Sequence, residues 1–449
     1  MNMLKKLTIV IFLISCTLQA QTYVKGTLNP AEDYSWIVLY QLKGVKQLYI
    51  KNVTITNGEF SIEFPKNAPI GIYRLMFSQQ KDGFVDFIYN KESIELNFNP
   101  ANPLQTVKFL TSEENNTYQK YLMENSSQQQ TLDSLQVSFF NVQDEIKKAE
   151  IVNLYKIKLD SLNKFQTTYE AITKSYLANH FIKSNKKYYA TQLFDSAQKY
   201  LNSEKQHYFD FIDFTDKELL NATFLSEKVI EYIFYLNGSE DVQMQNGLYK
   251  VSVQEVLQRL GNDENLKSEL LTLLLHSFAQ IENTILIDFI IDNYYDKLPK
   301  NLQDQSFLSQ IEEKVKLAVG KKAPEITWEE NGVTKKLSEL EIADNYIVVF
   351  WSTKCSHCLS QIPKLYEFTK DKPNIHVIGF ALEKDAIGFN NYIPKLQKWT
   401  NILGLEKWQN PVVKEYQITA TPTYFVLDAN KKIIAKPDYF ENIKAFFEN

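Results

Sequence analysis

Two cysteines separated by two residues carry the clearest chemical signal in this sequence. Cys355 and Cys358 follow the apolar run 346–351 and open an amphipathic helical stretch. At such a strand-to-helix junction the first sulfur lies at the helix amino terminus, where unpaired N–H groups favour a thiolate. Because a thiolate is the species that attacks a disulfide, the spacing predicts thiol–disulfide exchange, with Cys355 as nucleophile and Cys358 as resolving thiol.

Residues beside the pair are candidates for tuning its reactivity. His357 is a potential cation between the cysteines, and Lys354 adds a positive charge before them. Both would lower the pKa of Cys355 and make the couple more oxidising, unless they are simply exposed side chains with little effect. Pro363 lies inside the expected helix, where it removes a hydrogen bond to the carbonyl of Leu359 and predicts a kink.

Other uses of a cysteine pair fit this sequence less well. Structural zinc needs four ligands, and only His357 and His376 lie nearby, so neither a metal nor another cofactor is expected. A peroxiredoxin-type peroxidase would have its hydroxyl residue at Ser352 but needs a proline where Val348 stands. A permanent disulfide in a binding protein stays open as an alternative, although so short a loop closes little chain entropy.

The elements that must position the pair begin near Gly320, after a helix expected to end around residue 319. Apolar strand-like runs alternate there with amphipathic stretches, which is typical of an α/β sheet covered on both faces. Strands are expected at 346–351, 375–381, 423–427 and 432–435, and helices at 356–370, 385–399, 408–416 and 439–447. We therefore expect an α/β domain at 320–449.

The rest of the 449-residue chain is too long for one further compact domain, and its pattern changes once. From 21 to 103 alternating residues predict an antiparallel β-sandwich, with an Asn57-Gly58 hairpin between two apolar runs. Its further strands are expected at 35–42, 70–77, 84–89 and 93–98. The region 104–319 is expected to be all-α, since glycine and proline are absent from long parts of it.

Two segments of the helical region carry specific expectations. The polar patch 126–130 is interpreted as a helix end or loop, and the apolar stretch 270–291 as one buried core helix. The second stretch contains His276, Glu282 and Asp288, which are too polar for a membrane span.

The first twenty residues predict a secretory signal peptide. Lys5 and Lys6 precede the apolar run 7–14, and Ala20 offers a small residue at a cleavage point. Cys16 allows a second interpretation, a lipoprotein whose lipidated cysteine becomes the mature amino terminus. Either route exports the protein, so we expect it in the periplasm or cell envelope of a Gram-negative bacterium. The net charge of −5 and the pI of about 5.8 argue against nucleic acid as a partner.

The region 320–449 resembles the thioredoxin superfamily in its exported branch, the TlpA/ResA-like disulfide reductases. The residues that carry this resemblance are the segment 350–358 (Phe-Trp-Ser-Thr-Lys-Cys-Ser-His-Cys), Pro363, and the segment 418–428 (Ile-Thr-Ala-Thr-Pro-Thr-Tyr-Phe-Val-Leu-Asp). The resemblance implies a cis Pro422 facing the disulfide, with Thr421 offering backbone groups to a substrate strand. It also implies a substrate-binding role for Trp351.

The remaining parts resemble the same group of proteins more loosely. The β region is similar to the small domain of unknown function that precedes such thioredoxin modules in exported proteins of Bacteroidetes-type bacteria. Two positions depart from the family, because Lys354 replaces a frequent tryptophan and the strand 346–351 has no buried carboxylate. Glu325 and Glu383 are therefore the candidates for helping to deprotonate Cys358.

The expected function is an exported thiol:disulfide oxidoreductase, most simply a reductase of protein disulfides. The alternatives are a disulfide-donating oxidase or isomerase, and a non-enzymatic binding protein with a structural Cys355–Cys358 disulfide. The expected partners are exported proteins with cysteines or disulfides, and a membrane or periplasmic redox partner that donates electrons.

Overall fold

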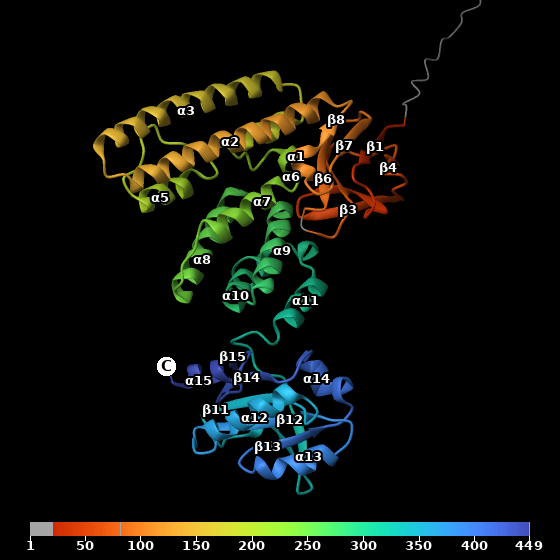
Figure 1. Ribbon diagram of the computed structural model, residues 1–449, viewed down its shortest axis with the longest axis vertical. Coiled ribbons are helices and arrows are strands. Elements are labelled where there is room, and N and C mark those ends of the chain that lie inside the picture. Colours follow the sequence, from red (N-terminus) through yellow and green to blue (C-terminus); the bar gives the residue numbers. More distant parts are fainter. Residues whose placement is uncertain (1–20, 81, 449) are drawn as a thin grey trace, which may run out of the picture. The chain divides into compact units, whose positions relative to one another are not determined.

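The computed structural model describes residues 21–80 and 82–448 of the chain (Figure 1). The predicted signal peptide at 1–20, including Cys16, lies outside these residues. The chain separates into two units, one of Met1–Asp241 with Val251–Asn262 and the other of Val242–Lys250 with Asp263–Asn449. The domain limits at 103 and 319 stay predictions.

The amino-terminal part of the first unit is a β-sandwich, which confirms the predicted fold class. Its two sheets have the strand orders β4-β1-β7-β8 and β3-β2-β5-β6, and apolar side chains from both fill one core. The strands are β1 (Tyr23–Leu28), β2 (Trp36–Lys43), β3 (Lys46–Thr54), β4 (Glu59–Glu63), β5 (Gly71–Met76), β6 (Phe84–Tyr89), β7 (Ile94–Phe98) and β8 (Lys108–Phe109). One pair departs from the expected antiparallel pattern, since β1 and β7 run parallel.

The Asn57-Gly58 turn forms, but it does not join a hairpin. Both residues have positive φ (53° and 80°), and Thr56 and Glu59 exchange backbone hydrogen bonds of 3.0 Å. The strands on either side then separate, because β3 pairs with β2 in one sheet and β4 pairs with β1 in the other. The alternating pattern fits a hairpin and a crossing between the sheets equally well, because Ile55 and Phe60 enter the same core in this fold. The predicted hairpin is therefore wrong, and the turn crosses between the sheets.

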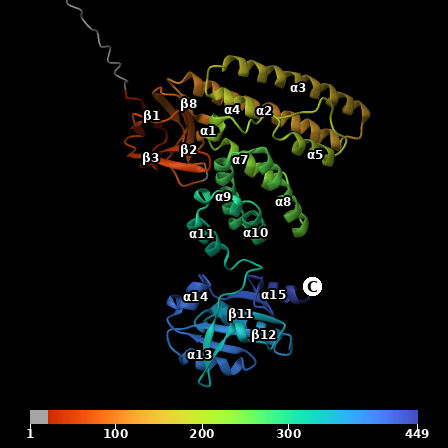
Figure 2. The ribbon, with the colours of Figure 1, turned by 180° about the vertical axis from the view of Figure 1, so that it is seen from behind.

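Two long helices dominate the rest of the first unit. Figures 1 and 2 show α2 (Glu113–Asn141) and α3 (Glu145–Ile172) lying side by side, and Leu132 and Leu159 belong to their shared core. The segment 126–130 lies inside α2, so the expected helix end is wrong there. One of its polar side chains ties the helix to a distant segment, since Gln129 Nε2 donates to Asn185 O at 3.3 Å.

Shorter helical elements complete this unit. They are α1 (Pro103–Thr106), α4 (Ala178–Ser184), α5 (Ala197–His207), α6 (Lys217–Leu220), α7 (Phe224–Ile230) and the π-helical turn Glu231–Tyr235, and α8 (Val242–Arg259) contributes to both units.

The second unit begins with helices that correct two expectations. The stretch expected as one helix is divided into α9 (Glu264–Gln280) and α10 (Thr284–Asn293). Between them Glu282 adopts a left-handed φ of 52°, and the Asn283 side chain caps α10 by accepting a hydrogen bond from Leu286 N at 3.1 Å. The next helix, α11 (Gln305–Val315), ends four residues before the expected limit near residue 319.

The carboxy-terminal part is the predicted α/β domain. Its sheet has the order β13-β12-β11-β14-β15, with β11, β12 and β13 parallel and β14 antiparallel to β11. Buried apolar clusters cover both faces, one beneath α12, α13 and α15 and the other beneath α14. The strands are β11 (Asn345–Trp351), β12 (Ile375–Leu382), β13 (Thr400–Gly404), β14 (Thr423–Asp428) and β15 (Ile433–Ala435), and the helices are α12 (Ser356–Thr369), α13 (Ile387–Tyr392), α14 (Pro411–Glu415) and α15 (Phe440–Glu448).

Two features of this domain differ from the expectation. The helix expected at 385–399 is shortened to α13, and the unexpected strand β13 follows it at the edge of the sheet. A separate two-stranded ribbon of β9 (Thr327–Glu330) and β10 (Val333–Lys336) precedes β11. Within 21–80 and 82–448, no helix has both the length and the apolar character that a membrane crossing requires.

Candidate functional site

The cysteine pair lies where β11 ends and α12 begins. Cys355 is the N-cap of α12, with extended backbone (φ −96°, ψ 111°), and its Sγ accepts a hydrogen bond from Cys358 N at 3.1 Å. Both cysteines are free thiols; Cys355 is partly exposed, whereas Cys358 is fully buried. The chain thus presents one sulfur to solvent and keeps the other beneath the first turn of the helix.

The pKa values of the two thiols are shifted in opposite directions. Burial would raise the pKa of Cys355, but hydrogen bonds from the Cys358 thiol and N–H, the Thr421 hydroxyl and the His357 backbone N–H lower it below its ordinary value. Burial and the hydrogen bond to Cys355 raise the pKa of Cys358 to about 12. The geometry therefore favours a thiolate at the exposed sulfur and keeps the proton on the buried one.

The loop before β14 lies directly against the nucleophile. The Thr421–Pro422 peptide bond is cis, which confirms the conformation that the family resemblance implied. Cys355 Sγ donates to Thr421 O at 3.3 Å, so the structure joins residues 66 positions apart in the sequence. Both Thr421 and Pro422 are partly exposed and therefore reachable by a substrate.

The two predicted tuning residues, Lys354 and His357, are exposed. The His357 ring packs edge-to-face against Tyr439, with centroids 6.3 Å apart, while its backbone N–H is the group that acts on Cys355. A tuning role for the side chains of Lys354 and His357 stays a prediction.

Trp351 occupies the floor of the site rather than its surface. Its side chain is fully buried, and its ring packs against Tyr392 with centroids 5.1 Å apart. All of β11 after its first residue is buried, because helices and loops cover both faces of the central strand. A substrate cannot reach this indole, so the substrate contact expected for Trp351 is wrong.

The two carboxylates considered for proton transfer have different positions. Glu383 follows β12, is 3% exposed, and accepts hydrogen bonds from Thr353 N (2.5 Å) and Ser352 Oγ (3.2 Å). It therefore fixes the turn that leads into Cys355. Glu325 is exposed, and its carboxylate accepts a hydrogen bond from Ser338 N at 3.0 Å.

Sequence reasoning missed several buried polar groups in this part of the domain, among them those of Gln361 and Tyr424. Among the residues that the structure describes, the Tyr424 hydroxyl and Gln361 Oε1 are buried without a hydrogen-bond partner. Gln361 lies three residues after Cys358, on the same side of α12, which is a signal that helical spacing could have provided. Tyr424 lies two residues after Pro422, but only its pairing with β11 places it in the core.

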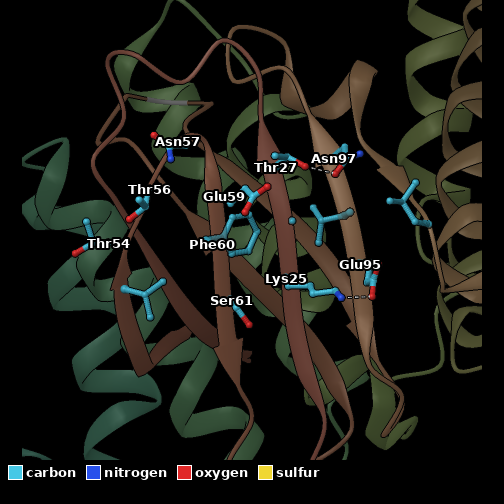
Figure 3. A pocket seen from close by; sticks show the side chains of 14 residues that line it. Lys25, Thr27, Thr54, Thr56, Asn57, Glu59, Phe60, Ser61, Glu95 and Asn97 are labelled. Carbon is cyan, nitrogen blue, oxygen red and sulfur yellow. Dashed lines mark hydrogen bonds and ion pairs between the residues drawn. The ribbon is translucent and has the colours of Figure 1, made fainter.

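A separate pocket of about 620 Å³ lies on the β-sandwich (Figure 3). It is lined mainly by polar side chains, which pair among themselves: Lys25 with Glu95 at 2.5 Å and Thr27 with Asn97 at 2.6 Å. This pocket contains no cysteine or histidine and so offers no group for exchange chemistry.

Within 21–80 and 82–448, no three His, Cys, Asp or Glu side chains are grouped closely enough to hold a metal ion.

Several known proteins are similar to the carboxy-terminal part of the chain. A family model described as thioredoxin-like matches residues 344–433. A domain of a possible thiol-disulfide isomerase from Cytophaga hutchinsonii is 32% identical, covering 29% of this chain and 90% of that chain, with a TM-score of 0.26. The thioredoxin domain of a thiol-disulfide oxidoreductase from Bacteroides vulgatus is 26% identical. This match covers 29% of this chain and 97% of that chain, with a TM-score of 0.25. No curated protein matches the chain.

Proposed function

Since the chain belongs to the thioredoxin superfamily through its carboxy-terminal domain and is a thiol:disulfide oxidoreductase, we propose that it reduces disulfides of exported proteins. The observation that carries the exchange chemistry is the asymmetry of the pair: a partly exposed Cys355 with a lowered pKa beside a buried Cys358 with a raised one. In such a pair Cys355 can attack a substrate disulfide at once, and Cys358 can attack the resulting mixed disulfide later. The reductive direction rests on the resemblance of residues 320–449 to exported disulfide reductases.

The reaction proceeds in two exchanges. The Cys355 thiolate attacks one sulfur of a substrate disulfide and expels the other as a thiolate, leaving a mixed disulfide. Cys358 then loses its proton and attacks Cys355 Sγ, which releases the second substrate sulfur as a thiolate. Two enzyme thiols are oxidised to one disulfide while one substrate disulfide is reduced to two thiols.

Substrate binding is assigned to Thr421 and Pro422. When Cys355 is ionised, it no longer donates to Thr421 O, so this carbonyl becomes free to accept from the backbone of an extended substrate. Lys354 and His357 supply weak tuning, because exposed charges interact weakly across water.

The direction of electron flow is proposed as reductive. The shift toward oxidation expected from His357 is weakened, because its ring packs on Tyr439 and only its backbone N–H acts on Cys355. A membrane or periplasmic redox partner would then re-reduce the pair. Location in the periplasm or cell envelope, with or without a lipid on Cys16, rests on the signal-like sequence 1–20.

The test is reduction of insulin disulfides by the full chain in the presence of dithiothreitol. We expect activity to be lost in Cys355→Ser and retained in Cys16→Ser, the matched control that removes the third cysteine. Cys358→Ser should accumulate mixed disulfides with exported proteins. Undiminished activity in Cys355→Ser would contradict the proposal, and so would a reduction potential below about −300 mV, which indicates a structural disulfide.

A second assay measures how fast the oxidised protein forms disulfides in a reduced, unfolded substrate. If this rate exceeds the rate at which the reduced protein reduces insulin, the oxidase or isomerase alternative is favoured.

A further inference from the structure

Two buried hydroxyls of the carboxy-terminal domain, those of Thr353 and Tyr424, have no hydrogen-bond partner among the described residues, and the Tyr424 hydroxyl is the one on a fully buried side chain. Tyr424 pairs with Val349 across β14 and β11, is 1% exposed, and belongs to the same apolar cluster as Cys358 and Ile443. Its hydroxyl has no hydrogen-bond partner among the described residues. Buried hydroxyls are rarely left unpaired, because they lose their bonds to water without compensation.

The comparison with Tyr416 shows that this domain satisfies a buried hydroxyl elsewhere. Tyr416 is equally buried, packs in the cluster on the other face of the sheet, and donates its hydroxyl to Pro324 O at 2.6 Å. Tyr416 shows that a buried tyrosine in this sheet can find an acceptor, whereas Tyr424 beside the cysteines does not.

Both cysteines and Glu441 act electrostatically on the Tyr424 hydroxyl. Burial raises the pKa of Tyr424, and the charges of Cys358, Glu441 and Cys355 raise it further. The phenol therefore stays protonated and can act only as a donor when negative charge develops beside it. Of these groups, Cys358 is the one that shares the buried cluster and must become negative for exchange to finish.

We propose that the Tyr424 hydroxyl donates a hydrogen bond to the Cys358 thiolate while the mixed disulfide is resolved. The proposal rests on the proposed function, because it assigns a donor to the second exchange. In the reduced resting state Cys358 keeps its proton and needs no donor, which explains why the hydroxyl is unpaired there. Once the thiolate forms, a buried negative sulfur gains a charge-assisted bond.

The donor takes no part in the bond changes. The Cys358 proton leaves to solvent, the Cys358–Cys355 sulfur bond forms, and the bond from Cys355 to the substrate sulfur breaks with its electron pair on the substrate. Tyr424 retains its proton throughout and lowers the energy of the attacking thiolate. It therefore speeds the second exchange and leaves the first unchanged.

The experiment separates the two exchanges with the aromatic disulfide dithiobis(nitrobenzoate), in a full chain that carries Cys16→Ser so that only two thiols remain. Attack by Cys355 releases one coloured thiolate, and resolution by Cys358 releases a second. We expect Tyr424→Phe to slow the second phase about tenfold and to change the first phase less than about twofold. Tyr416→Phe, which also removes a buried hydroxyl, should leave the ratio of the two phases unchanged.

A second measurement reports directly on the Cys358 sulfur. In a Cys16→Ser, Cys355→Ser background, the rate of Cys358 alkylation by iodoacetamide is followed against pH. Tyr424→Phe should move this profile to higher pH, whereas a loss of packing alone would accelerate alkylation without moving it.

The possible outcomes are distinct. Equal second phases in wild type and Tyr424→Phe, or an equal slowing of both phases, would overturn the role of Tyr424 and leave the proposed function intact. A wild-type chain that releases no coloured thiolate would overturn the proposed function, and the role of Tyr424 with it.

Discussion

Removal of the Glu383 carboxylate is expected to loosen the turn that presents the nucleophile. In Glu383→Ala the Thr353 N–H and the Ser352 hydroxyl lose their acceptor in a buried place. Each unsatisfied group costs about 1–3 kcal/mol, and relief from burying a carboxylate offsets part of the sum. We expect a net loss of about 2–3 kcal/mol in the local stability of the turn.

The measurement is amide hydrogen exchange of the peptide that spans residues 351–358, in the full chain. A local readout is needed because a chain of two units has no single free energy of unfolding. Protection of the Thr353 amide should fall about 30- to 150-fold, since about 1.4 kcal/mol corresponds to a factor of ten. Glu383→Gln should cost only about 1 kcal/mol, because a neutral acceptor remains.

Glu325→Ala is the matched control for this experiment. Its carboxylate is exposed and binds Ser338, so protection of Thr353 should not change. Unaltered protection in Glu383→Ala would refute the assignment of Glu383 to this turn. An equal loss in Glu325→Ala would show that the effect spreads through the domain and is not local.

Two further predictions concern the acid strengths of the thiols. Thr421→Val should raise the pKa of both cysteines and slow alkylation of Cys355 at neutral pH, because a hydroxyl donor to both sulfurs is lost. Thr423→Val is the control, because the Thr423 hydroxyl donates to Ala420 O and not to a cysteine. Faster alkylation of Cys355 in Thr421→Val would contradict this prediction. The Cys358 proton is lost near pH 9.0 in the unfolded state and near 12 in the folded state, so the region around Cys358 in the reduced protein should lose about 1.4 kcal/mol of stability per pH unit between these values. The measurement is the urea dependence of hydrogen exchange in the peptide that spans residues 351–358, compared with Cys358→Ala. An equal pH dependence in the two proteins would contradict the raised pKa.

The elements next to the cysteine pair could be predicted because their signals are local. The continuous apolar run gives β11, the Cys-x-x-Cys spacing gives the start of α12, and the Thr421-Pro422 motif gives the start of β14. The edge strand β13 was missed, because the residues before it resemble a longer amphipathic helix than the one that forms.

The contacts that complete the site could not be predicted, because they join distant segments. Glu383 reaches the turn before Cys355 only because β12 lies beside β11, and Tyr424 enters the cysteine cluster only because β14 pairs with β11. Burial of Trp351 likewise depends on helices that cover both faces of its strand. Composition and spacing identify residue types, but sheet order decides which of them meet.

The first exchange prepares the second. In the reduced site, burial raises the pKa of Cys358 most, and the hydrogen bond to Cys355 and the charge of Cys355 add to it. When Cys355 enters a mixed disulfide, it no longer carries that charge and accepts hydrogen bonds weakly as a neutral sulfur. Two of the three causes that keep Cys358 protonated are thereby removed, while the Thr421 hydroxyl and Ser352 backbone still favour its thiolate. Cys358 therefore stays protonated and unreactive until Cys355 has formed a mixed disulfide with a substrate. In the reduced pair, only Cys355 is then reactive as a thiolate.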